Sequence, residues 1–166
     1  MATPVDAPVI ARVHVDTWRT SYRGIVPDDF LAKLSYERPT EKWAEILGDG
    51  ENFVYVAEDE LARIVGFASG GPERNGDPVY RGELLRLYVL ESAQRRGLGR
   101  RLVGCVATRL RQAGIHSMLV WTMAEGPSRH FYKALGGRPV SVGQWDFGDL
   151  TVDEVAYGWT ATCALG

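Results

Sequence analysis

Cysteine, histidine and long apolar runs are all scarce in this sequence of 166 residues. The two cysteines, Cys105 and Cys163, form no CxxC pair and the three histidines are scattered, so a zinc site is not expected. Cys105 falls on the apolar side of a predicted helix, where we expect a small buried side chain. No stretch approaches the roughly 18 apolar residues of a membrane span, and no basic segment precedes an apolar run at the N-terminus. We therefore expect no metal, no membrane contact and a cytoplasmic location.

A surplus of positive charge is also missing. The net charge of -2 argues against a protein that mainly binds nucleic acid. Hydrophobic residues make up 45% and charged residues 24%, which is typical of a globular protein, and the length predicts a single domain over residues 1–166. Within this balanced chain, Arg95, Arg96, Arg100 and Arg101 crowd into seven residues. Such a local cluster favours a small anionic ligand.

Apolar residues change their spacing along the chain, and the change predicts alternating helices and strands. Helical spacing predicts helices over residues 6–22, 28–34, 39–47, 98–113 and 128–135. β-Branched and aromatic runs predict strands over residues 53–57, 63–69, 83–90, 117–123 and 152–159. The run 83–90 is broken by Arg86 but otherwise almost continuously apolar, as in a central strand covered on both faces. The order predicts an α/β (α+β) fold with helices on both faces and one central β-α-β unit.

The segment between the central strand and the strongest helix reads Gln94-Arg95-Arg96-Gly97-Leu98-Gly99-Arg100-Arg101. A helix start leaves backbone N–H groups without internal partners and carries partial positive charge. Glycines at 97 and 99 let a phosphate approach the backbone, and arginines add charge-assisted hydrogen bonds. A plain solvated turn explains the cluster poorly, because cations at a helix N-terminus oppose the dipole. The loop is therefore predicted to hold a pyrophosphate.

Two other phosphate-binding loops fit this segment less well. A nucleoside-triphosphate loop would need GxxxxGK[ST], which the sequence does not contain. A dinucleotide-binding fingerprint needs a small residue where Leu102 stands, and a strand that runs straight into the first glycine. Here residues 91–96 intervene. A dinucleotide-binding module is thus the weaker alternative.

Three segments carry a likeness to a known enzyme family. Leu87-Tyr88-Val89, followed by the loop at 94–99, resembles a Q/R-x-x-G-x-G/A cofactor motif. The stretch Phe131-Tyr132-Lys133-Ala134-Leu135-Gly136-Gly137 looks like an FY-x-x-x-G segment, and residues 15–18 with 22–25 are similar to a first helix and its following loop. In this order they resemble the GNAT superfamily of N-acetyltransferases. The resemblance implies a mixed, mostly antiparallel sheet with a central parallel β-α-β pair, and acetyl transfer from acetyl-CoA to an amine.

The same resemblance implies a set of cofactor-binding residues. Residues 94–101 would wrap the pyrophosphate of coenzyme A. The backbone of Tyr88 and Val89 would pair with the pantetheine amides where the two central strands splay, because such amides need partners once they leave water. A backbone N–H near Val89 would face the charge that develops on the acetyl oxygen. The full set is Leu87, Tyr88, Val89, Gln94, Arg95, Arg96, Gly97, Leu98, Gly99, Arg100, Arg101 and Ser128.

The chain departs from the family pattern at two places. Gly126 stands where many members have an asparagine, so a side-chain contact to the cofactor is lost and Ser128 is the candidate replacement. Only residues 1–4 precede the first helix, so the first edge strand of the family is short or missing. We expect this second departure to affect stability more than function.

Tyr132 and Glu83 are the candidate catalytic residues. The resemblance implies that Tyr132 lies beside the sulfur of coenzyme A and protonates the leaving thiolate, whereas a tyrosine on a short helix is otherwise most often packing. Glu83 opens the central strand, where its carboxylate could accept the amine proton directly or through water. A solvated strand-end glutamate is an equal interpretation, and water alone could carry the proton away.

The acceptor is expected to be an amine of a small molecule, peptide or protein. Trp18, Tyr22 and Trp145 are candidate walls of its pocket, although aromatic residues at such positions are more often core. Glu125 and Asp146 could attract a cationic amine, or could be solvated loop charges.

Two points of function stay open. An exposed edge strand would allow a homodimer. A non-catalytic acyl-CoA-binding domain of the same fold is the alternative function; it would bind coenzyme A without depending on Tyr132.

Overall fold

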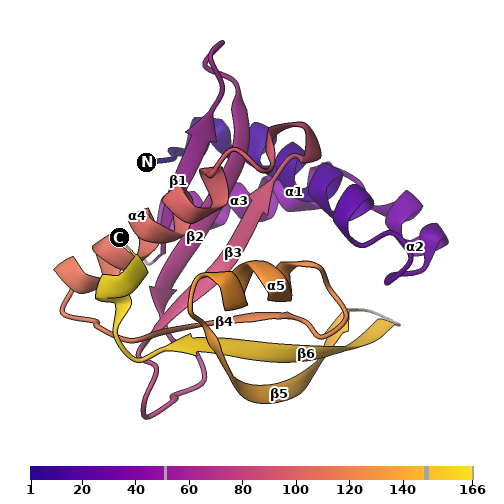
Figure 1. The fold of residues 1–166 in the computed structure, drawn as a ribbon. Helices are drawn as coiled ribbons and strands as arrows, with labels where there is room; N and C mark the ends of the chain where they lie inside the picture. Colours follow the sequence, from indigo (N-terminus) through magenta and orange to yellow (C-terminus); the bar gives the residue numbers. More distant parts are fainter. Residues whose placement is uncertain (51, 148–149, 166) are drawn as a thin grey trace.

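Six strands form one mixed sheet that separates two layers of helices (Figure 1). The computed structural model describes residues 1–50, 52–147 and 150–165. The helices are α1 (Ala7–Ser21), α2 (Asp28–Lys33), α3 (Glu37–Asp49), α4 (Leu98–Gln112) and α5 (Ser128–Ala134), with short 3₁₀ turns at η1 (Pro4–Asp6), η2 (Glu91–Ala93) and η3 (Thr162–Leu165). The strands are β1 (Phe53–Glu58), β2 (Ile64–Pro72), β3 (Gly82–Val89), β4 (Met118–Met123), β5 (Arg138–Phe147) and β6 (Leu150–Trp159).

The strand order across the sheet is β1-β2-β3-β4-β6-β5. In the described part of the chain β3 and β4 are the one parallel pair, and the other neighbours run antiparallel. Helix α4 connects β3 to β4, because parallel neighbours need a long crossover. The expectation of a mixed, mostly antiparallel sheet with a central parallel β-α-β pair is confirmed.

The parallel pair is joined only at its beginning. Its register pairs Gly82 with Met118 and Glu83 with Leu119, and no later pairing between the two strands is found in the described chain. Beyond this point β3 and β4 diverge, as Figure 1 shows, and leave a gap between their carboxyl-terminal halves. A register shift between β2 and β3 leaves Leu85 without a partner, so a β-bulge bends β3 at the start of the divergence.

The two faces of the sheet are covered by different helices. Helix α4 packs Val103, Val106 and Leu110 on one face, where helical spacing brings them into a common stripe. Helices α1 and α3 cover the other face, and α1 packs against Trp43 of α3 and Phe67 of β2. Helix α5 packs Tyr132 into the same core as α4, and Figure 1 shows α5 just above β4. We call the two surfaces the α4 face and the α1 face.

Three details differ from what the sequence pattern predicts, or sharpen it. Strand β5 was not predicted, because its exposed edge position leaves polar residues and a fully solvated Val142 in place of a regular apolar alternation. The expectation of a buried Cys105 is wrong: its thiol is exposed, since the buried stripe of α4 passes through Val103 and Val106 on either side. No strand precedes α1 in residues 1–6; instead the Ala2 N–H donates to the Val54 carbonyl of β1 at 2.9 Å.

None of the described helices is both long enough and apolar enough to cross a bilayer.

Candidate active site

The arginine-rich loop enters α4 through two residues with left-handed backbone. Gly97, at the N-cap, has φ +78°, and Arg95 has φ +62°, a conformation that costs a non-glycine residue energy. No side chain in the described part of the chain caps the helix and its first turn has no acidic residue, so N–H groups of the first turn have no side-chain partner there. The side chains of all four arginines of the loop are exposed, and none forms an ion pair with the described residues. The helix start is therefore a positively charged site for an anion.

Two contacts fix this loop against the rest of the protein. The side-chain amide of Gln94 donates to the Val89 carbonyl at 2.9 Å, which ties the loop to the end of β3. Gly99 lies so close to α5 that an added Cβ would stand 3.2 Å from the Phe131 ring. The loop and the segment 131–137 are thus in direct contact, although about thirty residues separate them in the sequence.

The backbone N–H and C=O groups of successive β3 residues point alternately towards the neighbouring strand β2 and towards the gap. The Leu90 N–H donates to the Val65 carbonyl, and the register pairs Tyr88 with Phe67, so the polar groups of Tyr88 face β2. Those of Leu87 and Val89 face the gap, where the Val89 carbonyl accepts from Gln94. The family resemblance implies that the pantetheine amides pair with the backbone of Tyr88 and Val89. The alternating directions favour the backbone groups of Leu87 and Val89 for this pairing. Tyr88 instead presents its side chain on the α1 face.

Tyr132 is buried on the α4 face, with ring centroids 5.3 Å from Phe131 and 6.2 Å from Tyr157. Burial raises the pKa of its hydroxyl, and the neighbouring Tyr88 adds to this. The hydroxyl therefore keeps its proton throughout the neutral range. Tyr132 comes from one side of the sheet and Tyr88 from the other, and the two are near enough for Tyr88 to influence the pKa of Tyr132.

Tyr88 joins two of the predicted acceptor-pocket aromatics. Its hydroxyl accepts a hydrogen bond from Trp18 Nε1 at 3.0 Å. Burial raises the pKa of Tyr22, and the hydroxyls of Tyr88 and Tyr132 and a hydrogen bond to Tyr88 raise it further. Tyr22, Tyr88 and Tyr132 therefore form one group of hydroxyls at the gap.

The predicted acceptor walls also lie together. Trp18 is buried with Met123 and packs edge-on against Trp145 at 5.7 Å and Tyr22 at 4.9 Å. Phe30 of α2 lies 6.5 Å from Trp18. This cluster joins α1, α2, β4 and β5, so residues far apart in the sequence line one aromatic surface beside the gap.

Glu83 does not have the surroundings that either sequence interpretation assumed. Its carboxylate is 1% exposed, and both of its oxygens accept from Arg74, at 2.7 and 2.9 Å. The expectation of a solvated strand-end glutamate is wrong, because the loop between β2 and β3 folds Arg74 over it. Glu154 of β6 lies nearby, half-buried, and its pKa is raised by burial and by Glu83.

The remaining predicted residues are more exposed. Ser128 shares a hydrogen bond of 2.6 Å with Thr122, and its Oγ lies 3.5 Å from where a Cβ on Gly126 would stand. It thus occupies space next to the asparagine position of the family. Glu125 and Asp146 are exposed, and Asp146 accepts a hydrogen bond from Thr151.

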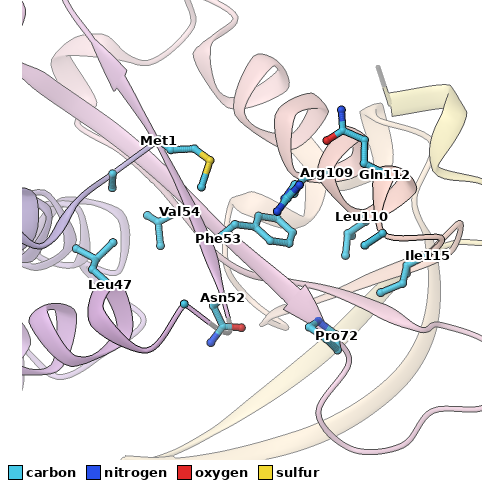
Figure 2. Close-up of a pocket in the computed structure, with 13 residues that line it drawn as sticks. Met1, Leu47, Asn52, Phe53, Val54, Pro72, Arg109, Leu110, Gln112 and Ile115 are labelled. Atoms are coloured by element: carbon cyan, nitrogen blue, oxygen red, sulfur yellow. The ribbon is translucent and has the colours of Figure 1, made fainter.

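Two cavities lie outside the gap. One, of about 500 Å³, opens between β1 and the end of α4, where Phe53, Arg109, Leu110 and Ile115 line it (Figure 2). None of the predicted site residues borders it. A second, of about 450 Å³, opens beside the arginine loop and includes Arg96 and Ser92. Among the residues that the structure describes, no cluster of His, Cys, Asp and Glu has the composition to hold a metal ion.

Comparisons with known proteins point to one family. The sequence profile of the acetyltransferase (GNAT) family matches residues 15–136. The uncharacterized N-acetyltransferase YuaI of Bacillus subtilis (strain 168) is 41% identical over 160 residues, which cover 96% of this chain and 91% of that protein.

Solved structures share the fold. A GNAT acetyltransferase from Desulfovibrio desulfuricans superposes with a TM-score of 0.71 at 21% identity, covering 98% of this chain and 96% of that one. YncA from Salmonella typhimurium, solved with its cofactor acetyl-CoA, gives a TM-score of 0.69 at 21% identity over 95% and 90% of the two chains.

Proposed function

The chain belongs to the acetyltransferase (GNAT) family, and from this premise we propose that it transfers the acetyl group of acetyl-CoA to a primary amine bound beside Trp18 and Tyr22. The observation that carries the proposal is the unpartnered start of α4, with four free arginines, next to a gap in the sheet. The matching proteins are named as acetyltransferases, which favours an enzyme over a non-catalytic acyl-CoA-binding domain.

The residues at the gap fit coenzyme A. The N–H groups at the start of α4 and the guanidinium groups of the loop suit its pyrophosphate. The outward-facing backbone groups of Leu87 and Val89 suit the amides of its pantetheine arm, which would otherwise be buried without partners. When bound, acetyl-CoA supplies a thioester whose acetyl group an amine can take up.

Tyr132 holds a proton at the gap. Its raised pKa keeps the hydroxyl neutral, so the proton is available where the thiolate of coenzyme A would leave. Tyr88 and Tyr22 add two further hydroxyl groups on the acceptor side. The balance of the reaction needs one proton removed from the amine and one given to sulfur.

The group that accepts the amine proton is assigned differently from the sequence expectation of Glu83. Because Arg74 engages both oxygens of Glu83, we favour water as the first acceptor of the amine proton, with the Glu83–Arg74 pair as a fixed dipole beside it. This leaves Glu83 a positioning residue unless its carboxylate is released from Arg74.

The test is titration of the protein with acetyl-CoA, coenzyme A and NADH, followed by an assay for free thiol with a panel of amines. Arg96→Ala/Arg100→Ala removes two guanidinium groups from the loop, and we expect a loss of acetyl-CoA affinity of roughly tenfold or more. Arg81→Ala/Arg109→Ala removes the same charge from exposed positions elsewhere and should bind normally. Equal loss in both double variants, or binding of NADH in place of acetyl-CoA, would contradict the proposal.

A further inference from the structure

Arg86 is a half-buried cation without an anionic partner among the described residues. It lies in the middle of β3 on the α1 face, and its guanidinium stands 5.2 Å from the centre of the Trp43 ring. We find no hydrogen bond or ion pair between this guanidinium and the described part of the chain. Partial burial of the group lowers the pKa of Arg86. Its five N–H donors therefore lie beside the Trp43 ring without an acidic side chain of the described residues to pair with.

Two further polar groups beside Arg86 are also without partners. Ser69, directly opposite Arg86 in the β2–β3 register, has a fully buried hydroxyl that makes no hydrogen bond with the described residues. The Nδ1 atom of His14 on α1 is likewise buried and unpaired. The His14 ring stacks on Tyr88 at 4.7 Å, next to Arg86 along the same strand. Buried polar groups are nearly always hydrogen-bonded, so two unpaired buried atoms beside the Arg86 guanidinium indicate a ligand.

The charges around this cluster indicate an anion. The nearby carboxylate of Glu83 is already bound by Arg74. Burial, and then the charge of Arg86, lowers the pKa of His14 to about 4, so its ring is neutral at pH 7 and can offer an N–H. Arg86 and a serine hydroxyl are also donors. A carboxylate accepts hydrogen bonds from all three, and bidentate pairing with arginine is its strongest geometry.

We propose that Arg86, together with Ser69 and His14, binds a carboxylate of the acceptor, so that the substrate is an amino carboxylate such as an amino acid. This inference rests on the proposed function. Arg86 immediately precedes Leu87, whose backbone faces the gap, and it shares the α1 face with Tyr88. A carboxylate on Arg86 therefore leaves the amine of the same small molecule near the group of tyrosine hydroxyls.

The experiment compares amines that differ only in the carboxylate. Three pairs are offered with acetyl-CoA: glycine and methylamine, leucine and 3-methylbutylamine, and phenylalanine and 2-phenylethylamine. For at least one pair, we expect the kcat/KM of the wild-type protein to favour the amino acid by about tenfold or more. Arg86→Gln should abolish that preference by raising the KM of the amino acid, while Arg81→Gln, at the exposed arginine just before the same strand, should keep it. Ser69→Ala should reduce the preference by a smaller factor.

Direct binding makes the result independent of turnover. Titration of each compound into protein saturated with coenzyme A should show affinity for an amino acid and less for its decarboxylated partner. If no pair shows a preference for the carboxylate in binding or in kcat/KM, the inference is overturned. It is also overturned if Arg86→Gln weakens both members of a pair equally, because that result assigns Arg86 a structural role over Trp43. Thermal unfolding of Arg86→Gln and Arg86→Lys checks that the variants are folded. The titration with acetyl-CoA is separate, so its failure would remove the proposed function by itself.

Discussion

The proposed cofactor loop and the proposed acceptor surface are built in opposite ways. The loop at residues 94–101 is one continuous segment, and its arginines are exposed. The acceptor surface takes Trp18 from α1, Tyr88 from β3 and Trp145 from β5, and its polar groups are largely buried. The loop would bind the cofactor through backbone groups and solvated charges. The acceptor surface would bind the amine through side chains that tertiary packing brings together. The difference suggests that binding of coenzyme A and choice of acceptor can be changed separately, and four predictions test this.

The largest expected effect lies at the junction of the two regions. Tyr132→Phe removes the hydroxyl proposed to donate a proton, so kcat should fall by roughly 10²- to 10³-fold while acetyl-CoA affinity stays within twofold. The neighbouring Tyr157→Phe makes the same chemical change in the buried core and should keep most of the activity. Steady-state thiol release and titration calorimetry measure both. Full activity in Tyr132→Phe would assign the proton to another donor.

The buried acceptor face should make stability depend on pH, and the exposed loop should not. The pKa of His14 is lowered from 6.5 to about 4 in the folded protein, so the unfolded chain binds more protons between these values. Stability is complete above pH 6.5 and falls as the pH drops towards 4. The loss should reach roughly 2 kcal/mol at pH 5.

Urea unfolding of the wild type at pH 7.5 and pH 5 measures this loss. His14→Gln should reduce the loss of unfolding free energy between pH 7.5 and pH 5 by that amount. His130→Gln, at an exposed position, should leave this loss unchanged. A wild-type pH dependence that His14→Gln leaves intact would assign the protons to other groups.

A change confined to the loop backbone should alter the affinity for acetyl-CoA alone. Gly97→Ala places a Cβ at φ +78°, which costs roughly 1 to 2 kcal/mol, so acetyl-CoA affinity should fall by about tenfold through a displaced loop. Gly48→Ala, inside α3 with open space around it, should bind acetyl-CoA normally. Titration calorimetry compares the two, and an unchanged Kd in Gly97→Ala would show that the loop conformation is not needed.

The smallest effect should be confined to the acceptor. Trp18→Phe removes the N–H that donates to Tyr88, and a lost hydrogen bond of about 1 kcal/mol should raise the acceptor KM about fivefold. Acetyl-CoA affinity should stay the same. Trp159→Phe removes a comparable bond to the Leu135 carbonyl in the α4-face core, so it should lower the melting temperature without this change in KM. A parallel loss of acetyl-CoA affinity in Trp18→Phe would show that the two regions are coupled.

Prediction from the sequence succeeded where the signal was local. The period of the apolar residues located α4 and the central strand β3 to within one residue at each end. It failed for β5, whose residues alternate weakly at a sheet edge, and for Cys105, which a single helical step turns out of the buried stripe. The signal for Arg86 was visible as a lone cation inside an apolar run, but its meaning depended on Ser69 and His14, which come from other elements.

The sequence by itself determined the family, the order of the elements and the arginine loop, because these depend on contiguous patterns and on helix-start chemistry that operates within a few residues. Only the tertiary structure decided that Glu83 is closed off by Arg74, that the Tyr88 hydroxyl accepts from Trp18, and that Arg86 has no acidic partner among the described residues. The partners of a buried charge are chosen by packing between segments far apart in the chain, and low dielectric makes that choice matter energetically.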